Sequence, residues 1–255
     1  MSRCWADSLG DCVGPITGEH IVSSAVFTEN VISVQGFRWC KDEPRQIGVN
    51  GLTANVLCGR HNSTTSNLDS AAGNAMQVLR HSVALCEKNK KLMPWITPKI
   101  QHFRIDAGLL ERWMLKTTLN LKYGSLLGEG NVVAPGSAAT LEEAELCFGL
   151  RPFTGAAGMY TAYANGANLR MLDKVTINTL LDNGELVGAR FELHGFRFLL
   201  NLRSESELPP LETIAGMDPA WNGAFLSRRF KHARFNHLSF PSHYVNFDWT
   251  SARIA

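Results

Sequence analysis

The stretch LCGRHNSTTSNLD, Leu57 to Asp69, places a cysteine and a histidine directly before a helix-like pattern. Cys58 and His61 are separated by two residues, a spacing that lets a turn at the start of a helix present two ligands to one ion. Cys4 and Cys12, near the beginning of the chain, supply two more thiols. These four residues predict a structural zinc site with three thiolate ligands and one imidazole ligand.

The two N-terminal cysteines leave the ligand set open. Seven residues lie between Cys4 and Cys12, more than the two to four that zinc motifs commonly have. Cys40 is therefore an alternative to Cys4. The remaining cysteines lie on apolar faces of helix-like patterns, and we expect them to be core residues: Cys86 and Cys147.

The composition is ordinary for a globular protein. Of the 255 residues 45% are hydrophobic and 19% are charged, and the net charge is +2. Nucleic-acid binding would therefore have to come from a local patch. The first twelve residues lack the apolar run of a signal peptide, and no stretch approaches the roughly 20 apolar residues of a membrane span. We expect a cytoplasmic protein with reduced thiols and no membrane partner.

Short strands and one helix are predicted in the N-terminal part. Asn30 to Trp39 alternates between apolar and polar residues and predicts a strand, with Leu52 to Cys58 as its partner. Apolar residues between Leu68 and Cys86 recur every three or four positions, which predicts a helix. Ser66 and Asp69 predict a capping box at the start of that helix.

A lysine- and proline-rich segment, Lys88 to Lys99, interrupts the pattern. We take it as the boundary between two domains, residues 1–90 and residues 91–255. The second domain reads as an α+β body in which helices precede antiparallel strands. The predicted fold class of the whole chain is therefore α+β.

The α+β body contains two helix signals and two turn signals. Asp106 to Gly124 predicts a helix, and a capping box at Thr140 and Glu143 predicts a shorter one. From Val175 onward the pattern is that of strands, with Asp182-Asn183-Gly184 as a hairpin signal and a further turn at Gly195.

A Glu-His pair, Glu19 and His20, lies between the cysteines in TGEHIVSSAVF. This segment and LCGRHNSTTSNLD together resemble the HNH endonucleases, the ββα-metal nucleases built on a treble-clef zinc finger. The resemblance is closest to bacterial HNH-like proteins with the motifs SGEH…S and LCxxHN…SxLD. It covers residues 4 to about 80 and implies that these residues form a treble-clef ββα-metal module.

The resemblance implies a DNA endonuclease that hydrolyses phosphodiester bonds. By position, His20 would be the general base, because the pKa of an unperturbed imidazole lies near neutrality. Glu19 and Asn62 would bind Mg²⁺ or Mn²⁺, which prefer oxygen ligands. Asn55 matches the family's middle Asn, which holds the loop carrying the catalytic histidine, and Asn50 is a rival for that role. His61 replaces a Cys that is more frequent in the family, and in a competing arrangement His61 binds the catalytic metal while the zinc site is absent or incomplete.

The C-terminal part contains a basic and aromatic stretch. No Asp or Glu occurs between Asp218 and Asp248, and basic residues there alternate with aromatic ones. This composition suits a phosphate backbone and stacked bases, although a solvated basic edge over a core element explains it equally well. The candidate nucleic-acid-binding residues are Arg228, Arg229, Lys231 and Arg234.

Two other classes of function are consistent with the same residues. The first is a zinc-stabilised module that binds nucleic acid or protein without catalysis. The second is an effector in which residues 91–255 sense a ligand or partner and switch the N-terminal nuclease. The sequence leaves open whether the chain forms a homo-oligomer.

Overall fold

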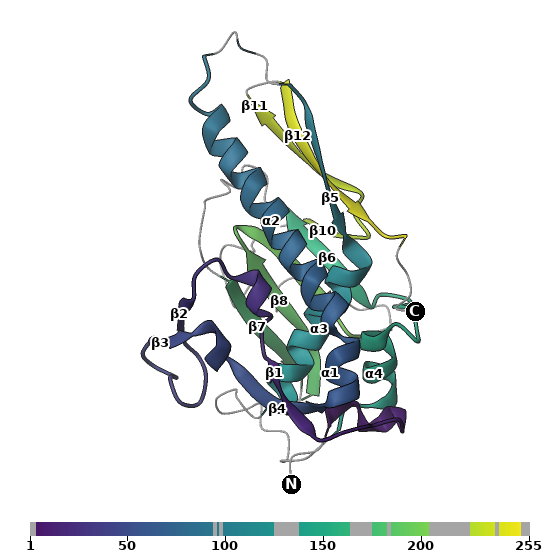
Figure 1. Cartoon of the computed structure of the whole chain (residues 1–255). Coiled ribbons are helices and arrows are strands. Elements are labelled where there is room, and N and C mark those ends of the chain that lie inside the picture. The colour runs from purple at the N-terminus through teal and green to yellow at the C-terminus, as the bar shows by residue number, and fades with distance from the viewer. Residues whose placement is uncertain are drawn as a thin grey trace.

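The computed structural model shows a mixed α+β protein, which confirms the predicted class (Figure 1). Within the part of the chain that is described, no helix has both the length and the apolar character needed to cross a bilayer. The structure describes residues 4–93, 96, 99–124, 138–163, 175–182, 185–203, 225–237 and 240–250.

The N-terminal part combines two separate two-stranded sheets with two helices. In chain order its elements are η1 (Trp5–Leu9), β1 (Ile16–His20), η2 (Ser24–Val26), β2 (Val31–Val34), β3 (Arg45–Gly48), η3 (Val49–Gly51), β4 (Thr53–Cys58), α1 (Gly59–Thr64) and α2 (Ser66–Asn89).

Strand pairing in this part differs from the prediction. The predicted pairing of residues 30–39 with residues 52–58 is wrong, because β2 pairs with β3 and β4 pairs with β1. β2 and β3 lie on either side of a local turn in which the Gly36 N–H donates to the Cys40 carbonyl at 3.0 Å. Gly36 has a φ of 90°, which glycine adopts without strain. This local hairpin leaves β4 to pair with the strand that contains the Glu-His motif.

Two larger sheets follow. A five-stranded antiparallel sheet has the order β10-β6-β9-β8-β7, and a three-stranded sheet has the order β11-β12-β5 with β5 parallel to β12. The elements are β5 (Gln101–Asp106), α3 (Ala107–Tyr123), α4 (Leu141–Phe148), β6 (Gly158–Tyr163), β7 (Val175–Asp182), β8 (Glu185–Leu193), β9 (Phe196–Asn201), β10 (Phe225–Arg228), β11 (His232–His237) and β12 (Phe240–Asp248).

Several local predictions in the second half are confirmed. The helix expected over residues 106–124 is α3, and the Thr140–Glu143 capping box begins α4. β7 and β8 pair up to Asp182 and Glu185, while Asn183 and Gly184 of the predicted hairpin lie outside the described residues. The predicted turn at Gly195 joins β8 to β9.

The capping box predicted at the start of α2 is wrong. The helix begins after Thr65, which makes no side-chain cap hydrogen bond. The Asp69 carboxylate instead accepts hydrogen bonds from Ser23 and from Lys116. A tertiary ion pair therefore uses the residue that the local pattern assigned to capping. The apolar face of α2 is as predicted and fully buried: Leu68, Ala72, Met76, Leu79 and Val83.

Helix α3 lies at the centre of the molecule and is buried on nearly all sides. The Asp106 carboxylate caps it by accepting from the Leu109 N–H at 2.9 Å. Trp113 packs against Phe191 of β8 with ring centroids 5.9 Å apart. A helix buried all round is normally apolar, yet α3 carries polar side chains that contact the N-terminal elements, as described below.

The predicted division at residue 90 stays a prediction. One continuous cluster of buried apolar side chains includes residues from both sides of it, such as Met76 of α2 and Trp113 of α3. Residues 1–90 therefore share a core with helix α3 of the second predicted domain.

His243 of β12 belongs to the core, although the sequence pattern placed it in a basic surface stretch. It has no exposed area and lies against α2, where its Nε2 is 2.7 Å from the Ser82 hydroxyl oxygen. Its ring stacks on Phe235 with centroids 4.4 Å apart. Burial lowers the pKa of His243 from 6.5 to about 4. The folded protein therefore holds this imidazole neutral at neutral pH.

Acid should weaken the fold partly through His243. The unfolded chain binds this proton below pH 6.5 and the folded chain only near pH 4, so stability falls as the pH drops between these values. Between pH 7.5 and 5.5 we expect His243 to account for about 1.4 kcal/mol of lost unfolding free energy. Urea unfolding of wild type and His243→Gln at both pH values measures this, since other titrating groups affect both proteins alike. An equal pH dependence in the two proteins would contradict the assignment.

Candidate metal centre

The four residues predicted to bind zinc lie together. Their ligand atoms, the Sγ atoms of the three cysteines and Nδ1 of His61, are all within 4.8 Å of one another. The distances from His61 Nδ1 to Sγ are 3.4 Å for Cys4, 3.6 Å for Cys12 and 3.3 Å for Cys58. Residues separated by up to 57 positions thus meet at one point.

These distances fit a tetrahedral zinc ion. With Zn–S bonds of about 2.3 Å and Zn–N bonds of about 2.0–2.1 Å, tetrahedral sulfur and nitrogen ligands lie roughly 3.6 Å apart. The three observed S–N distances lie between 3.3 and 3.6 Å. Three thiolates and one imidazole are also a common ligand set of structural zinc. The cluster can therefore hold a metal ion such as zinc.

Local backbone contacts hold the ligands in place. Cys58 ends β4 and His61 lies in the first turn of α1. The loop that carries Cys12 is fastened to the same turn, because the Gly59 N–H donates to the Pro15 carbonyl and the Arg60 N–H donates to the Val13 carbonyl. The chain beside Cys4 is anchored by Trp5, whose Nε1 donates to Asn120 Oδ1 of α3 at 2.9 Å.

Asp11 orients the histidine ligand. Nε2 of His61 lies 2.8 Å from Asp11 Oδ1, and Arg60 holds the other carboxylate oxygen at 2.7 Å. An imidazole that donates from Nε2 to a carboxylate keeps the lone pair of Nδ1 for a metal. Sequence reasoning missed Asp11, although a carboxylate directly before a candidate ligand is a usable signal.

The surroundings shift the pKa values of the three thiols in different directions. Burial raises the pKa of Cys4, and burial together with the neighbouring Cys4 thiol raises the pKa of Cys12. Burial also acts to raise the pKa of Cys58, but backbone hydrogen bonds at His61 and Val13 bring it below the usual value. A bound zinc ion reverses this balance, because thiols that coordinate zinc are deprotonated.

The geometry decides between the alternative ligand sets. Cys4, and not Cys40, completes the cluster; Cys40 is buried beside the turn between β2 and β3. His61 faces the three sulfurs, which favours the structural zinc arrangement over a catalytic metal at this residue. Cys147 is a core residue as predicted, whereas Cys86 is only half-buried.

Glu19 of β1 lies in a buried ion pair. Its side chain is 4% exposed, and its Oε1 contacts the ammonium of Lys116 from α3. Burial raises the pKa of Glu19, while the charge of Lys116 acts in the opposite direction. Lys116 was not singled out from the sequence; a lysine within the apolar helix run WMLKTTL is the signal that could have found it.

His20, the adjacent residue, is fixed through its backbone. Its carbonyl accepts a hydrogen bond from Asn120 Nδ2 at 3.1 Å. Within the described residues, His20 Nε2 is buried and has no hydrogen-bond partner. This nitrogen is the atom that a general base would use.

The two asparagines predicted for the site lie against β1. Nδ2 of Asn62 in α1 donates to Thr17 Oγ1 at 3.0 Å and to the Gly18 carbonyl at 3.4 Å. Asn55 of β4 lies directly across the ladder from Gly18. The structure thus places Asn62 and Asn55 beside Gly18, the residue that precedes the Glu-His pair. The Asn62 amide contacts Thr17 and Gly18, whereas the Glu19 carboxylate contacts Lys116.

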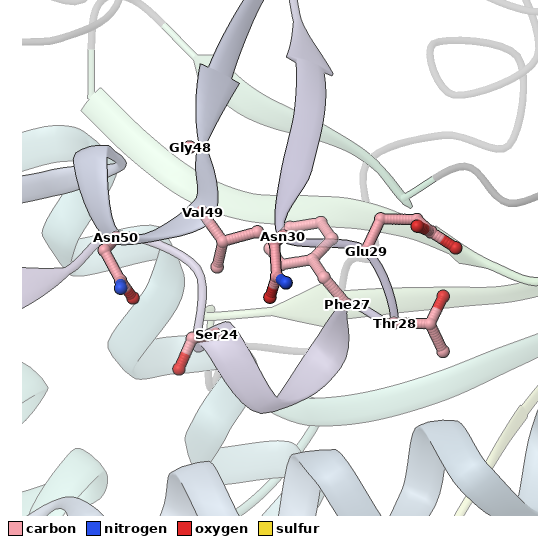
Figure 2. Close-up of a pocket in the computed structure, with 8 residues that line it drawn as sticks. All are labelled: Ser24, Phe27, Thr28, Glu29, Asn30, Gly48, Val49 and Asn50. Atoms are coloured by element: carbon pink, nitrogen blue, oxygen red, sulfur yellow. The ribbon is translucent and has the colours of Figure 1, made fainter.

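A surface pocket lies between η2 and the base of the β2–β3 hairpin, and Figure 2 shows the polar side chains of Ser24, Asn30 and Asn50 around it. Asn50, the alternative to Asn55 for the asparagine that supports the loop of the catalytic histidine, lines this pocket. None of the predicted catalytic or zinc-binding residues lines it. The lining residues are Ser24, Phe27, Thr28, Glu29, Asn30, Gly48, Val49 and Asn50.

The predicted basic residues lie around the edge strand β11. Arg229 and Lys231 are exposed just before this strand, and Arg234 is exposed within it. Arg228 ends β10. Beside Arg234 across the ladder is Tyr244, whose ring stacks on His102 of β5 with centroids 5.1 Å apart. His102 was missed from the sequence, because only the sheet brings β5 next to the C-terminal strands.

Comparison of the chain with protein-family models, with curated proteins and with solved structures finds no match to any of the three. The site is therefore interpreted from its own geometry.

The cluster predicts one zinc ion per chain. Cys58→Ser should lose the ion, because the substitution removes a ligand. Asp11→Asn should lower zinc affinity about 10- to 100-fold, because it removes the carboxylate that orients the His61 ligand. Metal content by mass spectrometry and competition with a chromogenic chelator measure both effects. Cys86→Ser, which lies outside the cluster, is the matched control and should keep its zinc. Full zinc content in Cys58→Ser would show that the cluster is not the metal site.

Proposed function

We propose that the chain is a zinc-stabilised HNH-type endonuclease that hydrolyses phosphodiester bonds in DNA. The observation that carries this proposal is the arrangement of β1, β4 and α1. β1 and β4 form an antiparallel pair, α1 follows β4 directly, and the zinc cluster joins the end of β4 to the start of α1. This order of strand, strand and helix is the one expected of a treble-clef ββα-metal module.

His20 is the proposed general base. The pairing of β1 and the hydrogen bond from the Asn120 amide to the His20 carbonyl fix the backbone at this position. In the described part of the chain, His20 Nε2 has no hydrogen-bond partner. A neutral imidazole takes a proton from water near neutral pH. The attacking water would give a proton to Nε2 of His20 as the new phosphorus–oxygen bond forms. The bond from phosphorus to the leaving sugar oxygen would break in the same displacement, and that oxygen would take a proton from solvent water.

Glu19 and Asn62 are the proposed ligands of a catalytic Mg²⁺ or Mn²⁺ ion. Lys116 contacts Oε1 of Glu19, and Asn62 donates through its Nδ2 to Thr17 and Gly18, so Glu19 Oε2 and Asn62 Oδ1 are the oxygens assigned to this role. Such an ion would neutralise charge on the phosphate. Asn55 is the proposed support of the β1 segment, because it faces Gly18 across the ladder.

The Glu19–Lys116 ion pair favours a second candidate function. A carboxylate that already has a cationic partner is a poorer ligand for a divalent ion. In this alternative, the zinc-stabilised module binds nucleic acid or protein and has no catalytic metal. It predicts zinc binding and nucleic-acid binding without Mg²⁺-dependent cleavage.

The face of the β11-β12-β5 sheet is the proposed surface for the DNA backbone. Lys231 and Arg234 supply exposed positive charge, and the stacked pair of Tyr244 and His102 offers a flat aromatic surface beside them. Positive charge attracts phosphate and aromatic rings accept bases. Phe230, which the sequence pattern grouped with these residues, is buried in the core and is excluded from the surface.

His20→Ala should abolish DNA cleavage. Loss of a general base commonly costs about 10²- to 10⁴-fold in rate, so nicking of a supercoiled plasmid in Mg²⁺ or Mn²⁺ should fall by at least two orders of magnitude. His81→Ala, which replaces an exposed histidine of α2, is the control and should cleave as wild type does.

Wild type and His20→Ala should contain equal amounts of zinc, because the substitution should change the rate of cleavage and leave the metal-binding cluster intact. Cleavage that survives in His20→Ala would refute the assigned base. Zinc binding with no cleavage by wild type would support the binding module instead.

The proposed DNA surface predicts a change in salt dependence. Replacing both Lys231 and Arg234 by Ala should weaken duplex binding and lower the slope of log K against log salt by about two, one for each phosphate contact removed. Fluorescence anisotropy over a salt series measures the slope. The Lys41→Ala/Arg45→Ala variant, with the same charge change on the β2–β3 hairpin, should keep the wild-type slope. Equal slopes in both double variants would place the DNA elsewhere.

A further inference from the structure

Lys116 joins three elements through one buried ammonium group. From α3, its Nζ lies 2.7 and 2.8 Å from the two carboxylate oxygens of Asp69 in α2. The same Nζ contacts Oε1 of Glu19 in β1. The side chains of Lys116 and Glu19 are 1% and 4% exposed, and that of Asp69 is 29% exposed. The two carboxylates thus share a single cation supplied by the chain.

The position of this ammonium is supported from the other side of Asp69. The Ser23 hydroxyl donates to Asp69 Oδ1, and Trp113 Nε1 donates to the Ser23 oxygen at 2.7 Å. Trp113 precedes Lys116 by three residues, so both side chains lie on one face of α3. The helix therefore holds both the cation and, through Ser23, one of its two anions.

The ammonium limits the negative charge that Glu19 can offer to another cation. Two ionised carboxylates and one ammonium carry a net charge of about −1, whereas the carboxylates alone would carry about −2. Divalent ions such as Mg²⁺ and Mn²⁺ bind through one or two carboxylates together with the phosphate of a substrate. A like charge beside the ligand repels a divalent ion strongly in a site with little exposure to water.

We propose that Lys116 is a positioning residue that holds Glu19 by one oxygen and weakens divalent-ion binding to the free protein. A divalent ion is then retained only when a substrate phosphate supplies additional negative charge. The second part of this inference rests on the proposed nuclease function. The first part concerns Glu19, Asp69 and Lys116 alone and is measured without nucleic acid.

The test uses the full-length, zinc-loaded protein and the binding of Mn²⁺, followed by electron paramagnetic resonance. Lys116→Met should bind Mn²⁺ at least about ten-fold more tightly than wild type, because a positive charge in contact with the ligand carboxylate has been removed. Glu19→Gln in the Lys116→Met background should abolish the gain. Lys116→Arg keeps the charge and should bind Mn²⁺ as weakly as wild type.

A purely structural role for Lys116 would not raise metal affinity, so equal or weaker Mn²⁺ binding by Lys116→Met overturns the inference. If Lys116→Met does not fold, Lys116→Met/Asp69→Asn is measured in its place. This double variant removes one charge of each sign and retains the net charge of the group. It too should bind Mn²⁺ more tightly than wild type, because Glu19 then has no ammonium partner, and equal binding overturns the inference.

Addition of a short DNA duplex separates the two parts. In wild type the duplex should tighten Mn²⁺ binding about ten-fold or more, and in Lys116→Met it should have a smaller effect. Tighter binding by Lys116→Met with no effect of DNA on either protein would overturn the substrate-dependent part, whereas the nuclease proposal itself is decided by plasmid cleavage with wild type. The role of Lys116 toward Glu19 would stand in that case.

Discussion

The buried ammonium of Lys116 is the constraint on which the arrangement of the other elements depends. A charge that is almost entirely removed from water must be paired, because an unpaired buried charge costs several kcal/mol. Lys116 satisfies this requirement with Asp69 of α2 and Glu19 of β1. The position of β1 relative to the two long helices is thereby restricted to arrangements in which both carboxylates reach one nitrogen atom.

The cluster of Cys4, Cys12, Cys58 and His61 and helix α3 restrain the Glu-His strand from two directions. The cluster joins the N-terminal loop to the end of β4 and the start of α1. Helix α3 contacts β1 itself, through Lys116 at Glu19 and through Asn120 at the carbonyl of His20. Asn120 also receives the indole N–H of Trp5, the residue after Cys4. One helix therefore connects the metal centre to the proposed base.

The two proposed DNA contacts lie toward opposite ends of α2. Figure 1 shows β1, β4 and α1 near the beginning of this helix and the β11-β12-β5 sheet beside its C-terminal half. A helix of 24 residues is about 36 Å long, which corresponds to roughly ten base pairs of DNA. Ser82 and His243 fasten the sheet to α2, so the helix sets the spacing between the two surfaces.

Features that depend on short spacings could be predicted from the sequence. Cys58 and His61 share a turn, Thr140 and Glu143 form a capping box, and the apolar repeat of α2 is a property of consecutive residues; all three were predicted because their partners lie within a few positions. The ligand pair of Cys4 and Cys12 was predicted from chemistry, but its choice over Cys40 required the fold. Tertiary structure alone decided that β1 pairs with β4, that Asp69 binds Lys116 and does not cap α2, and that His243 is buried. Strand pairing and the satisfaction of a buried charge depend on residues 33 to 161 positions apart, and no local pattern encodes contacts at such separations.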